Sequence, residues 1–239
     1  MVVRLGPTLS FPHPSRAGRD GLVAIGGDLR PERLLLAYSQ GIFPWPSEGM
    51  PLVWFSPEPR FVLPLDAVHL GRSLRKTMRS TSFTVTADRA FDRVIRACQA
   101  VPRPGQDGTW ITGAMVEAYE RLHALGFAHS IECWEGETLV GGLYGVSLGA
   151  AYFGESMFAH APDASKVAFA TFLEEARRWG FRFVDCQVPT EHLERFGAVP
   201  MRRADFLVAL AEALTEPTRQ GPWAIEVSPA EAASAFRDQ

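Results

Sequence analysis

Two acidic residues lie in stretches of the sequence that are otherwise typical of buried strands. Glu155 is in Gly154-Glu-Ser-Met-Phe158, within an apolar run over 150–158, and Asp185 lies within a second apolar run over 181–188. A carboxylate buried in such surroundings costs several kcal/mol unless it is paired, hydrogen-bonded or protonated. Because structure alone rarely requires two such residues in one domain, we interpret both as candidates for chemistry.

The alternation of a strand predicts where the second acid points. Residues i and i+2 share a face of a strand, so Asp185 and Gln187 are expected on one surface, whereas Cys186 faces the other way. Asp185 and Gln187 would then be neighbours that can contact each other or a shared ligand. Either acid could instead pair with a buried arginine, and the residues alone leave both possibilities open.

Cys186 is a candidate nucleophile, with His192 six residues later as its base. The alternation argues against this role, because Cys186 faces away from the surface of Asp185 and Gln187. We therefore interpret Cys186 as a small buried hydrophobic residue. The six histidines are scattered and no pair has the helical spacing of metal ligands, so the sequence predicts neither a metal site nor a cofactor.

A cationic segment and two tryptophans point to RNA. Within 71–80 the cations follow the spacing i, i+3, i+4 and i+7 with no acid between them, and they are Arg72, Arg75, Lys76 and Arg79. This stripe is either a solvated helix face or a surface for phosphates, with a salt-dependent interaction. Trp45 and Trp110 lie in turns flanked by Pro and Gly, where an indole is either core or a platform on which a base stacks. Together with the acids, these residues suggest an RNA end that is delivered to a reactive centre.

The bulk composition restricts the class of protein. The chain has 239 residues, 46% of them hydrophobic and 11% aromatic, which is enough for a substantial core. The net charge of −3 predicts no globally basic surface, so any RNA contact must be local. No apolar stretch approaches the length of a membrane span, no signal-peptide core is present, and the three cysteines are widely spaced. We therefore expect a soluble, cytoplasmic protein.

The elements that must position these residues divide into two regions. The first sixty residues are rich in proline, with one helix expected from Pro31 to Gly41, and they predict a small, irregular N-terminal domain over 1–61. From residue 62 to 239 the periodicities of helices and strands are clear, except that 217–239 is weakly patterned and is expected to be a peripheral tail. Helices are expected after Asp88, Thr112, Asp163 and Thr190 and over 204–214, and strands over 129–134, 138–146, 150–158 and 181–188. Three of these strands form a meander, so we predict an α+β (α/β layered) fold.

The chain resembles a known family at a series of motifs spread in order from about residue 20 to residue 210. It is similar to the bacterial leucyl/phenylalanyl-tRNA–protein transferases. The matching motifs are Gly21-Leu-Val-Ala-Ile-Gly-Gly-Asp-Leu29, Gly41-Ile-Phe-Pro-Trp45, Trp54-Phe-Ser-Pro-Glu-Pro-Arg60, Gly108-Thr-Trp-Ile-Thr112, Ala128-His-Ser-Ile-Glu132, Val140-Gly-Gly-Leu-Tyr-Gly-Val146, Gly154-Glu-Ser-Met-Phe158, Ala164-Ser-Lys166 and Asp185-Cys-Gln187.

The resemblance implies an activity and a fold. The activity is transfer of Leu, Phe or, less well, Met from aminoacyl-tRNA to proteins that begin with Arg or Lys, which marks them for degradation as N-degrons. The implied fold is a small N-terminal domain on a larger domain like the GCN5-related acetyltransferases, with a mixed sheet flanked by helices. The expected partners are the aminoacyl-tRNA and the acceptor protein, with no membrane, and the chain is expected to be a monomer.

The resemblance also implies roles for particular residues. Trp45 and Trp110 would hold the 3′-terminal adenosine, and the stripe of cations would contact the tRNA backbone. Five residues would line the pocket for the transferred side chain, and they are Leu143, Met157, Phe169, Phe172 and Val184. Glu155, Asp185 and Gln187 would form the acceptor and reaction site. Our hypothesis is that Asp185 orients Gln187, whose amide oxygen accepts a hydrogen bond from the attacking amine, while Glu155 with Asp185 neutralises the cationic acceptor.

The chain departs from the family pattern at a few positions. Leu143 stands where Met is common, and Phe55 replaces a frequent second Trp. Ala159-His160 stands where Ser-Arg is usual, and Arg202-Arg203 lies near a usual Pro-Arg.

Two other function classes stay open at this point. One is an acyl-CoA-dependent N-acetyltransferase on the same scaffold, although the pyrophosphate loop expected before the helix at Ala164 is absent. The other is a non-catalytic RNA-binding module, for which the buried acids would serve no purpose.

Overall fold

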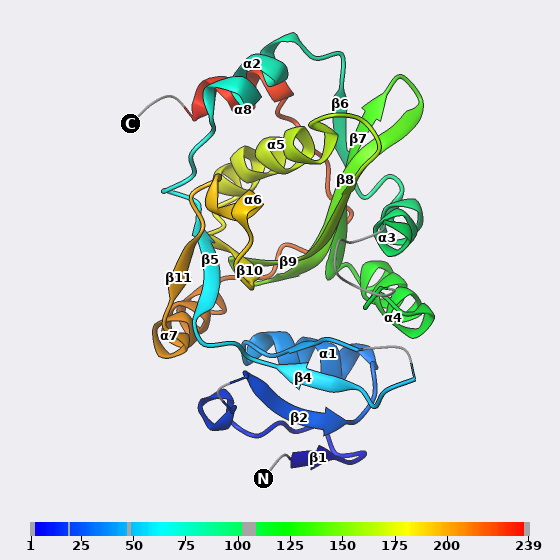
Figure 1. Cartoon of the computed structure of the whole chain (residues 1–239), viewed down its shortest axis with the longest axis vertical. Helices are drawn as coiled ribbons and strands as arrows, with labels where there is room; N and C mark the ends of the chain where they lie inside the picture. Colours follow the sequence, from blue (N-terminus) through cyan, green and yellow to red (C-terminus); the bar gives the residue numbers. More distant parts are fainter. Residues whose placement is uncertain (1–2, 19, 47–48, 102–108, 237–239) are drawn as a thin grey trace.

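The structure is a computed structural model that describes residues 3–18, 20–46, 49–101 and 109–236. It contains two sheets, a smaller one near the N-terminus and a larger one that carries most of the helices (Figure 1). The prediction of a mixed fold of strands and helices is confirmed. In the described part of the chain, no helix is both long and apolar enough to cross a membrane.

The N-terminal region is more regular than its proline content predicted. Four short strands form a sheet in the order β1-β2-β4-β3, and they span Val3–Leu5 (β1), Leu22–Gly26 (β2), Phe43–Pro44 (β3) and Val53–Phe55 (β4). One helix, α1, covers Pro31–Ser39 with proline at its first position, as predicted. A single 3-10 turn covers Pro14–Arg16. The chain then passes to the larger sheet between Phe55 and Arg60.

The larger sheet has seven strands in the order β11-β5-β10-β9-β8-β7-β6. Its strands are Arg60–Pro64 (β5), Thr84–Ala87 (β6), Ala128–Glu135 (β7), Thr138–Leu148 (β8), Ala151–Ala159 (β9), Phe183–Gln187 (β10) and Val199–Met201 (β11). The antiparallel meander β7-β8-β9 is confirmed. The strand β10 is parallel to β9 and antiparallel to β5, so the sheet is mixed.

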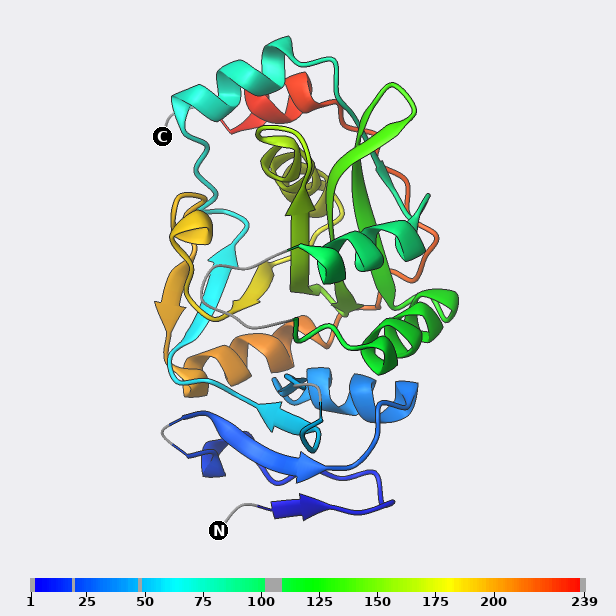
Figure 2. The same ribbon diagram turned by 45° about the vertical axis from the view of Figure 1, so that its right-hand side comes forward.

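Helices cover both faces of this sheet (Figures 1 and 2). They span Arg72–Ser80 (α2), Phe91–Ala100 (α3), Gly113–Ala124 (α4), Ala164–Arg178 (α5), Glu191–Glu194 (α6), Arg203–Ala213 (α7) and Pro229–Ala235 (α8). One core cluster joins α3, α4 and α7 with the N-terminal region, and a second joins α5 and α8 with the other face of the sheet. The larger sheet therefore separates two apolar cores.

The glycines of β8 allow a helix to lie close to the sheet. A Cβ on Gly141 would lie 2.7 Å from the Cβ of Ala164, at the first turn of α5. These glycines lie inside a strand, where the absence of a side chain permits a close approach of two elements. The N-terminus of α5 is thereby held against the middle of the sheet.

The expectation that 217–239 is a peripheral tail is wrong for the residues that the structure describes. Trp223 and Val227 are buried, and α8 packs between α2 and α5. The ring of Trp223 stacks on His129 with centroids 3.5 Å apart. The segment has a weak pattern because its few apolar residues are irregularly spaced, although Trp223, Val227, Ala232 and Ala233 are all buried.

The helix caps show where local signals were sufficient. Thr112 and Thr190 accept hydrogen bonds from Met115 N and Leu193 N, which confirms both predicted caps. Asp88 does not cap α3, whose N-cap is Ala90. The Asp88 carboxylate accepts instead from His129 Nδ1 at 2.8 Å and from Trp223 N at 2.7 Å, so long-range partners replace the local one.

Candidate active site

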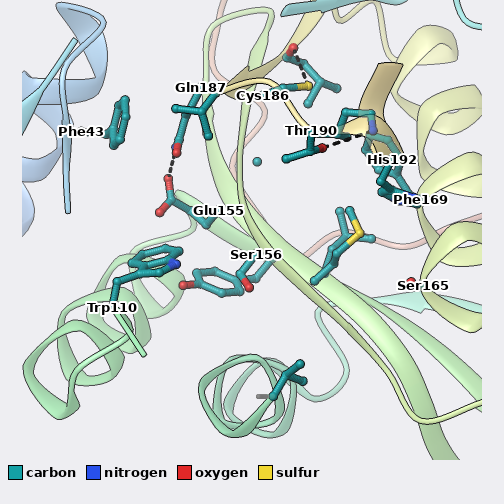
Figure 3. Close-up of a pocket in the computed structure, with 18 of the residues that line it drawn as sticks. Phe43, Trp110, Glu155, Ser156, Ser165, Phe169, Cys186, Gln187, Thr190 and His192 are labelled. Atoms are coloured by element: carbon teal, nitrogen blue, oxygen red, sulfur yellow. Dashed lines mark hydrogen bonds between the residues drawn. The ribbon is translucent and has the colours of Figure 1, made fainter. Parts of the chain in front are cut away.

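A pocket of about 540 Å³ lies where the N-terminal region meets the larger sheet. The segment Phe43–Trp45 and Trp110 form one side of it, and residues of β8, β9, β10, α5 and α6 form the rest. Figure 3 shows Trp110 and Phe43 on the side of Glu155, with Phe169 and His192 across the pocket. The pocket therefore draws its wall from segments that are far apart in the sequence.

Glu155 is the centre of a hydrogen-bond network at the wall of the pocket. Its Oε1 accepts from Tyr38 Oη at 2.7 Å and from Gln187 Nε2 at 2.8 Å, and its Oε2 accepts from Tyr119 Oη at 3.3 Å. The hydroxyls of Tyr38 and Tyr119 also bond to each other. Among the described residues that line the pocket, Glu155 is the only carboxylate.

The surroundings of Glu155 set its protonation near neutral pH. Burial raises the pKa of this carboxyl to about 7, while the hydrogen bonds from Tyr38, Gln187 and Tyr119 oppose that rise. The negative charge of Asp185 contributes to the same rise. Burial and the Glu155 charge also hold the pKa values of Tyr38 and Tyr119 well above 10, so both hydroxyls remain donors.

The raised pKa makes the stability of Glu155→Gln depend on pH in a defined direction. Because the folded pKa exceeds the unfolded one, wild-type Glu155 stabilises the fold most at low pH and loses this contribution as the pH rises to about 7. Solvent at the pocket screens part of the effect. We therefore expect the free energy of unfolding of Glu155→Gln, taken relative to that of the wild type, to be about 1–2 kcal/mol higher at pH 8 than at pH 4.5. Thermal unfolding of both proteins from pH 4.5 to 8 measures it, and a difference in Tm that does not change with pH would contradict the assignment.

Gln187 reaches Glu155 through a local departure from strand geometry. Its φ is 63°, in the left-handed region, and the pairing of β10 with β5 shifts register between Asp185 and Gln187. Because Nε2 donates to Glu155, Oε1 is the end of the amide that can accept a bond from a ligand. Figure 3 shows this side chain directed at Glu155, with the bond dashed.

Asp185 does not share the surface of Gln187, so the prediction from strand alternation is wrong on this point. Its side chain is fully buried against Arg60, on the opposite side of β10 from Cys186, and it is not part of the pocket wall. Asp185 Oδ1 accepts from Gln187 N at 3.0 Å. The alternation failed because Gln187, the last residue of β10, leaves the extended conformation.

Cys186 and His192 line the pocket without forming a nucleophile and base. The Cys186 thiol lies 3.7 Å from Val184 O, and burial raises the pKa of this thiol above its usual range. Burial also lowers the pKa of His192, whose Nε2 is buried without a hydrogen-bond partner. Within the described ranges, no group of three His, Cys, Asp or Glu residues could hold a metal ion.

Most of the residues expected to form an apolar pocket are brought together. Leu143, Met157, Phe169 and Val184 all line the cavity. Phe172 does not, which corrects that prediction. It is fully buried one turn further along α5, where its ring contacts that of Tyr152 with centroids 4.5 Å apart. Phe172 lies on nearly the same face of α5 as Phe169 but about one turn further along, where the side chain meets the core beyond the end of the pocket.

The two tryptophans of the predicted turns also meet at this pocket. Trp45 and Trp110 both line it, and Trp45 packs edge-on against Phe55 with centroids 6.0 Å apart. Gly108, which belongs to the same motif as Trp110, lies outside the described residues. The sequence missed Tyr38 and Tyr119, because their spacing on α1 and α4 is that of ordinary core residues and gives no sign of a shared carboxylate.

The sequence matches the models of one protein family over most of its length. A family model described as "Leucyl/phenylalanyl-tRNA protein transferase" matches residues 62–211, and one described as its N-terminal domain matches residues 27–58. The chain belongs to the leucyl/phenylalanyl-tRNA–protein transferase family. It is therefore an aminoacyltransferase.

Two similar relatives carry the name of this family. The leucyl/phenylalanyl-tRNA–protein transferase of Myxococcus xanthus is 64% identical over 213 residues, which cover 89% of this chain and 91% of the relative. That of Anaeromyxobacter sp. strain Fw109-5 is 58% identical over 225 residues, or 94% and 96% of the two chains. Among solved structures, a conserved protein of unknown function from Staphylococcus epidermidis is distantly similar, with a TM-score of 0.42 and 11% sequence identity. The similarity covers 76% of this chain and 68% of that protein.

The departures of this chain from the transferase family pattern have defined places in the structure. Leu143 lines the pocket, and the ring of Phe55, which does not line it, contacts the ring of Trp45 edge-on. Arg203 is the buried member of the Arg202-Arg203 pair and donates from Nη1 to Ser56 O at 2.6 Å. Arg202 is exposed and pairs with Asp205, and neither arginine lines the pocket.

Only some of the cations in the stripe of this transferase are exposed on its surface. Arg72, Lys76 and Arg79 are exposed on α2, but Arg75 is buried, so the expectation of four exposed cations is wrong at that position. Arg75 turns inward because the face of α2 that carries Met78 packs against α8. Figures 1 and 2 show α2 at the opposite end of the molecule from the N-terminal sheet.

Proposed function

We propose that this chain transfers Leu, Phe and, less well, Met from aminoacyl-tRNA to the α-amine of proteins that begin with Arg or Lys. The product would carry an N-degron, and the reaction would take place in the cytoplasm. The observation that carries this proposal is that one pocket joins two tryptophans, an apolar wall and the Glu155–Gln187 pair. Membership of the transferase family supports the same reaction.

The pocket divides into parts that suit the two halves of an aminoacyl-adenosine. Trp45 and Trp110 would stack on the terminal adenine, because every base offers a face to an aromatic ring. The transferred side chain would enter the wall formed by Leu143, Met157 and Phe169, which offers neither a charge nor a hydrogen-bonding group. An apolar wall of this kind discriminates weakly among Leu, Phe and Met, since a methylene is worth only about 1–3 kcal/mol.

The reaction is aminolysis of an ester that is already activated. The amine nitrogen forms a bond to the aminoacyl carbonyl carbon, the bond to the ribose oxygen breaks, and the proton lost by the amine passes to that oxygen. An α-amine has a pKa of roughly 7.7–8.0, so a useful fraction is neutral at physiological pH. The site has mainly to position it, and Gln187 Oε1 would accept a hydrogen bond from the attacking N–H.

Glu155 is the carboxylate that we propose for the acceptor's cationic side chain. Asp185 is unsuitable because its charge is already matched by Arg60 and it does not reach the pocket. A guanidinium or ammonium beside Glu155 would favour the ionised carboxylate and lower its pKa from about 7. Asp185 keeps the other part of its proposed role, since its bond to Gln187 N orients that residue.

Two further parts of the proposal concern the tRNA and the fold. Arg72, Lys76 and Arg79 on α2 would contact the tRNA backbone, with a salt-dependent interaction. We also propose that the larger sheet is arranged as in the GCN5-related acetyltransferases. In support, β9 and β10 pair in parallel up to Phe153 and Asp185, and residues that follow on both strands line the pocket.

A transfer assay tests the proposed function. The protein is incubated with Leu-tRNA that carries radiolabelled leucine and a peptide that begins with Arg, with and without acetyl-CoA. We expect label in the peptide without acetyl-CoA, and none when the peptide's α-amine is blocked by acetylation. Modification that depends on acetyl-CoA would identify an acetyltransferase, and RNA binding without transfer would identify a binding module.

Trp110→Ala is expected to weaken the interaction with the aminoacyl-tRNA. Loss of one stacked base costs about 1–3 kcal/mol, which corresponds to a rise in KM for Leu-tRNA of roughly 5- to 150-fold. The KM for the peptide should change little. Trp179→Ala is the matched control, because Trp179 packs against Trp223 at the C-terminal end of α5 and does not line the pocket. Equal effects of the two substitutions on the KM for tRNA would refute the role of Trp110.

A further inference from the structure

Arg60 and Asp185 form a fully buried ion pair directly behind the proposed reaction centre. Arg60 Nε donates to Asp185 Oδ1 at 2.7 Å, and Arg60 Nη2 donates to Asp185 Oδ2 at 2.5 Å, while both side chains are inaccessible to solvent. This two-point geometry fixes the plane of the carboxylate as well as its position. The pair is therefore a rigid support and cannot be a binding site for solvent or substrate.

The third nitrogen of the Arg60 guanidinium, Nη1, contacts the N-terminal region. Arg60 Nη1 donates to Gly41 O at 3.0 Å, just after α1. The guanidinium also lies over the rings of Phe43 and Phe206, at 4.8 and 4.6 Å from their centroids. Gly41 and Phe43 begin the short segment that carries Trp45 into the pocket. One side chain thus contacts both the segment of Trp45 and the strand of Gln187.

The conformation of Gln187 depends on the same carboxylate. A residue other than glycine at φ 63° is held there only by its surroundings. Asp185 Oδ1, which Arg60 holds, accepts the bond from Gln187 N at 3.0 Å. In an ordinary extended conformation, Gln187 would follow the alternation of the strand and would not be directed at Glu155 in this way.

From these contacts we infer that Arg60 is a positioning residue for the reaction, acting through Asp185 on Gln187 and through Gly41 on the segment of Trp45. The inference rests on the proposed function. Arg60 touches no substrate, because it is buried and is absent from the pocket wall. Its function is to hold the adenosine side and the acceptor side of the pocket at a fixed separation.

The test is Arg60→Lys, which keeps the charge but cannot make the two-point contact and the bond to Gly41 together. We expect kcat for transfer to fall about 100-fold, the size of effect that follows from displacing a reacting group by about 1 Å. The KM for the peptide should change little, because Glu155 is untouched. Arg33→Lys is the matched control, since Arg33 is equally buried and bonds Gly6 O and Asp28 Oδ2 without contacting β10.

Comparison of Arg60→Lys with Arg33→Lys distinguishes a loss of kcat caused by lower stability from one caused by a displaced Gln187. Both are assayed well below their measured Tm, with Leu-tRNA and peptide saturating. If Arg60→Lys keeps the kcat of the wild type, or if Arg33→Lys loses as much kcat at equal stability, the inference is wrong. A wild-type protein that transfers no label would instead refute the proposed function.

A double variant covers the case in which Arg60→Lys does not fold. Arg60→Gln with Asp185→Asn removes both buried charges and leaves two neutral amides, the second of them isosteric with the aspartate. We expect this protein to fold and to have a low kcat, because the two-point geometry is absent. Recovery of the wild-type kcat would show that the pair only balances charge, and it would overturn the inference.

Discussion

Gln187→Ala is expected to lower kcat for transfer about 100- to 1,000-fold while the protein remains folded. The side chain is held at Glu155 by its Nε2 donor at 2.8 Å, so its Oε1 faces the position where we place the attacking amine. A positioned group that assists proton transfer contributes about 10²–10⁴-fold. We expect the lower part of that range, because a neutral amide orients the amine and relays its proton without keeping it.

The measurement is a single-turnover rate of transfer from labelled Leu-tRNA to a peptide that begins with Arg, with the enzyme in excess. Gln220→Ala is the matched control, because Gln220 is exposed and does not line the pocket. The effect should fall on kcat and leave the KM for Leu-tRNA nearly unchanged, since Trp45 and Trp110 remain in place. A Gln187→Ala protein with a rate within tenfold of the wild type would remove Gln187 from the reaction centre.

Asp185→Asn is expected to destabilise the fold strongly as well as to lower transfer. The substitution leaves the guanidinium of Arg60 buried without a counter-charge, and removing one partner of a buried pair costs about 3–5 kcal/mol. For a chain of this length, such a loss corresponds to a fall in Tm on the order of 10 °C. Thermal unfolding followed by circular dichroism measures it.

Asp205→Asn is the control for this prediction, because Asp205 also pairs with an arginine, Arg202, but both side chains are exposed. Loss of an ion pair in contact with solvent typically costs about 1 kcal/mol or less. A fall in Tm for Asp185→Asn that is no larger than that for Asp205→Asn would show that the buried pair contributes little to the fold.

The elements that the sequence predicted well are those with strong local signals. Pro31 at the first turn of α1, Thr112 before α4 and the apolar runs of the meander each depend on residues a few positions apart. The four-stranded N-terminal sheet was missed because strands of two to five residues are too short to show a period. The burial of Trp223 was missed because its partner, His129, is remote in sequence.

The candidate site shows the same division between local and long-range information. The motifs identified Trp45, Trp110, Leu143 and Met157, and the structure brings all four to one pocket. Phe172 is the exception, because its direction depends on how α5 is rotated against the sheet. The hydroxyls of Tyr38 and Tyr119 converge on Glu155 only after α1 and α4 pack together, which no spacing in the sequence predicts.

The two buried acids show what each level of description decided. The sequence by itself determined that Glu155 and Asp185 must have partners, because an isolated carboxylate is too costly in an apolar strand. Only the tertiary structure decided which partners these are. Asp185 meets Arg60 of a neighbouring strand and is closed off, whereas Glu155 lies where the chains of β9 and β10 reach the pocket and is held by neutral donors. The reason is physical: the need for a partner follows from the residue and its neighbours in the chain, but the partner is supplied by segments that meet only when the chain folds.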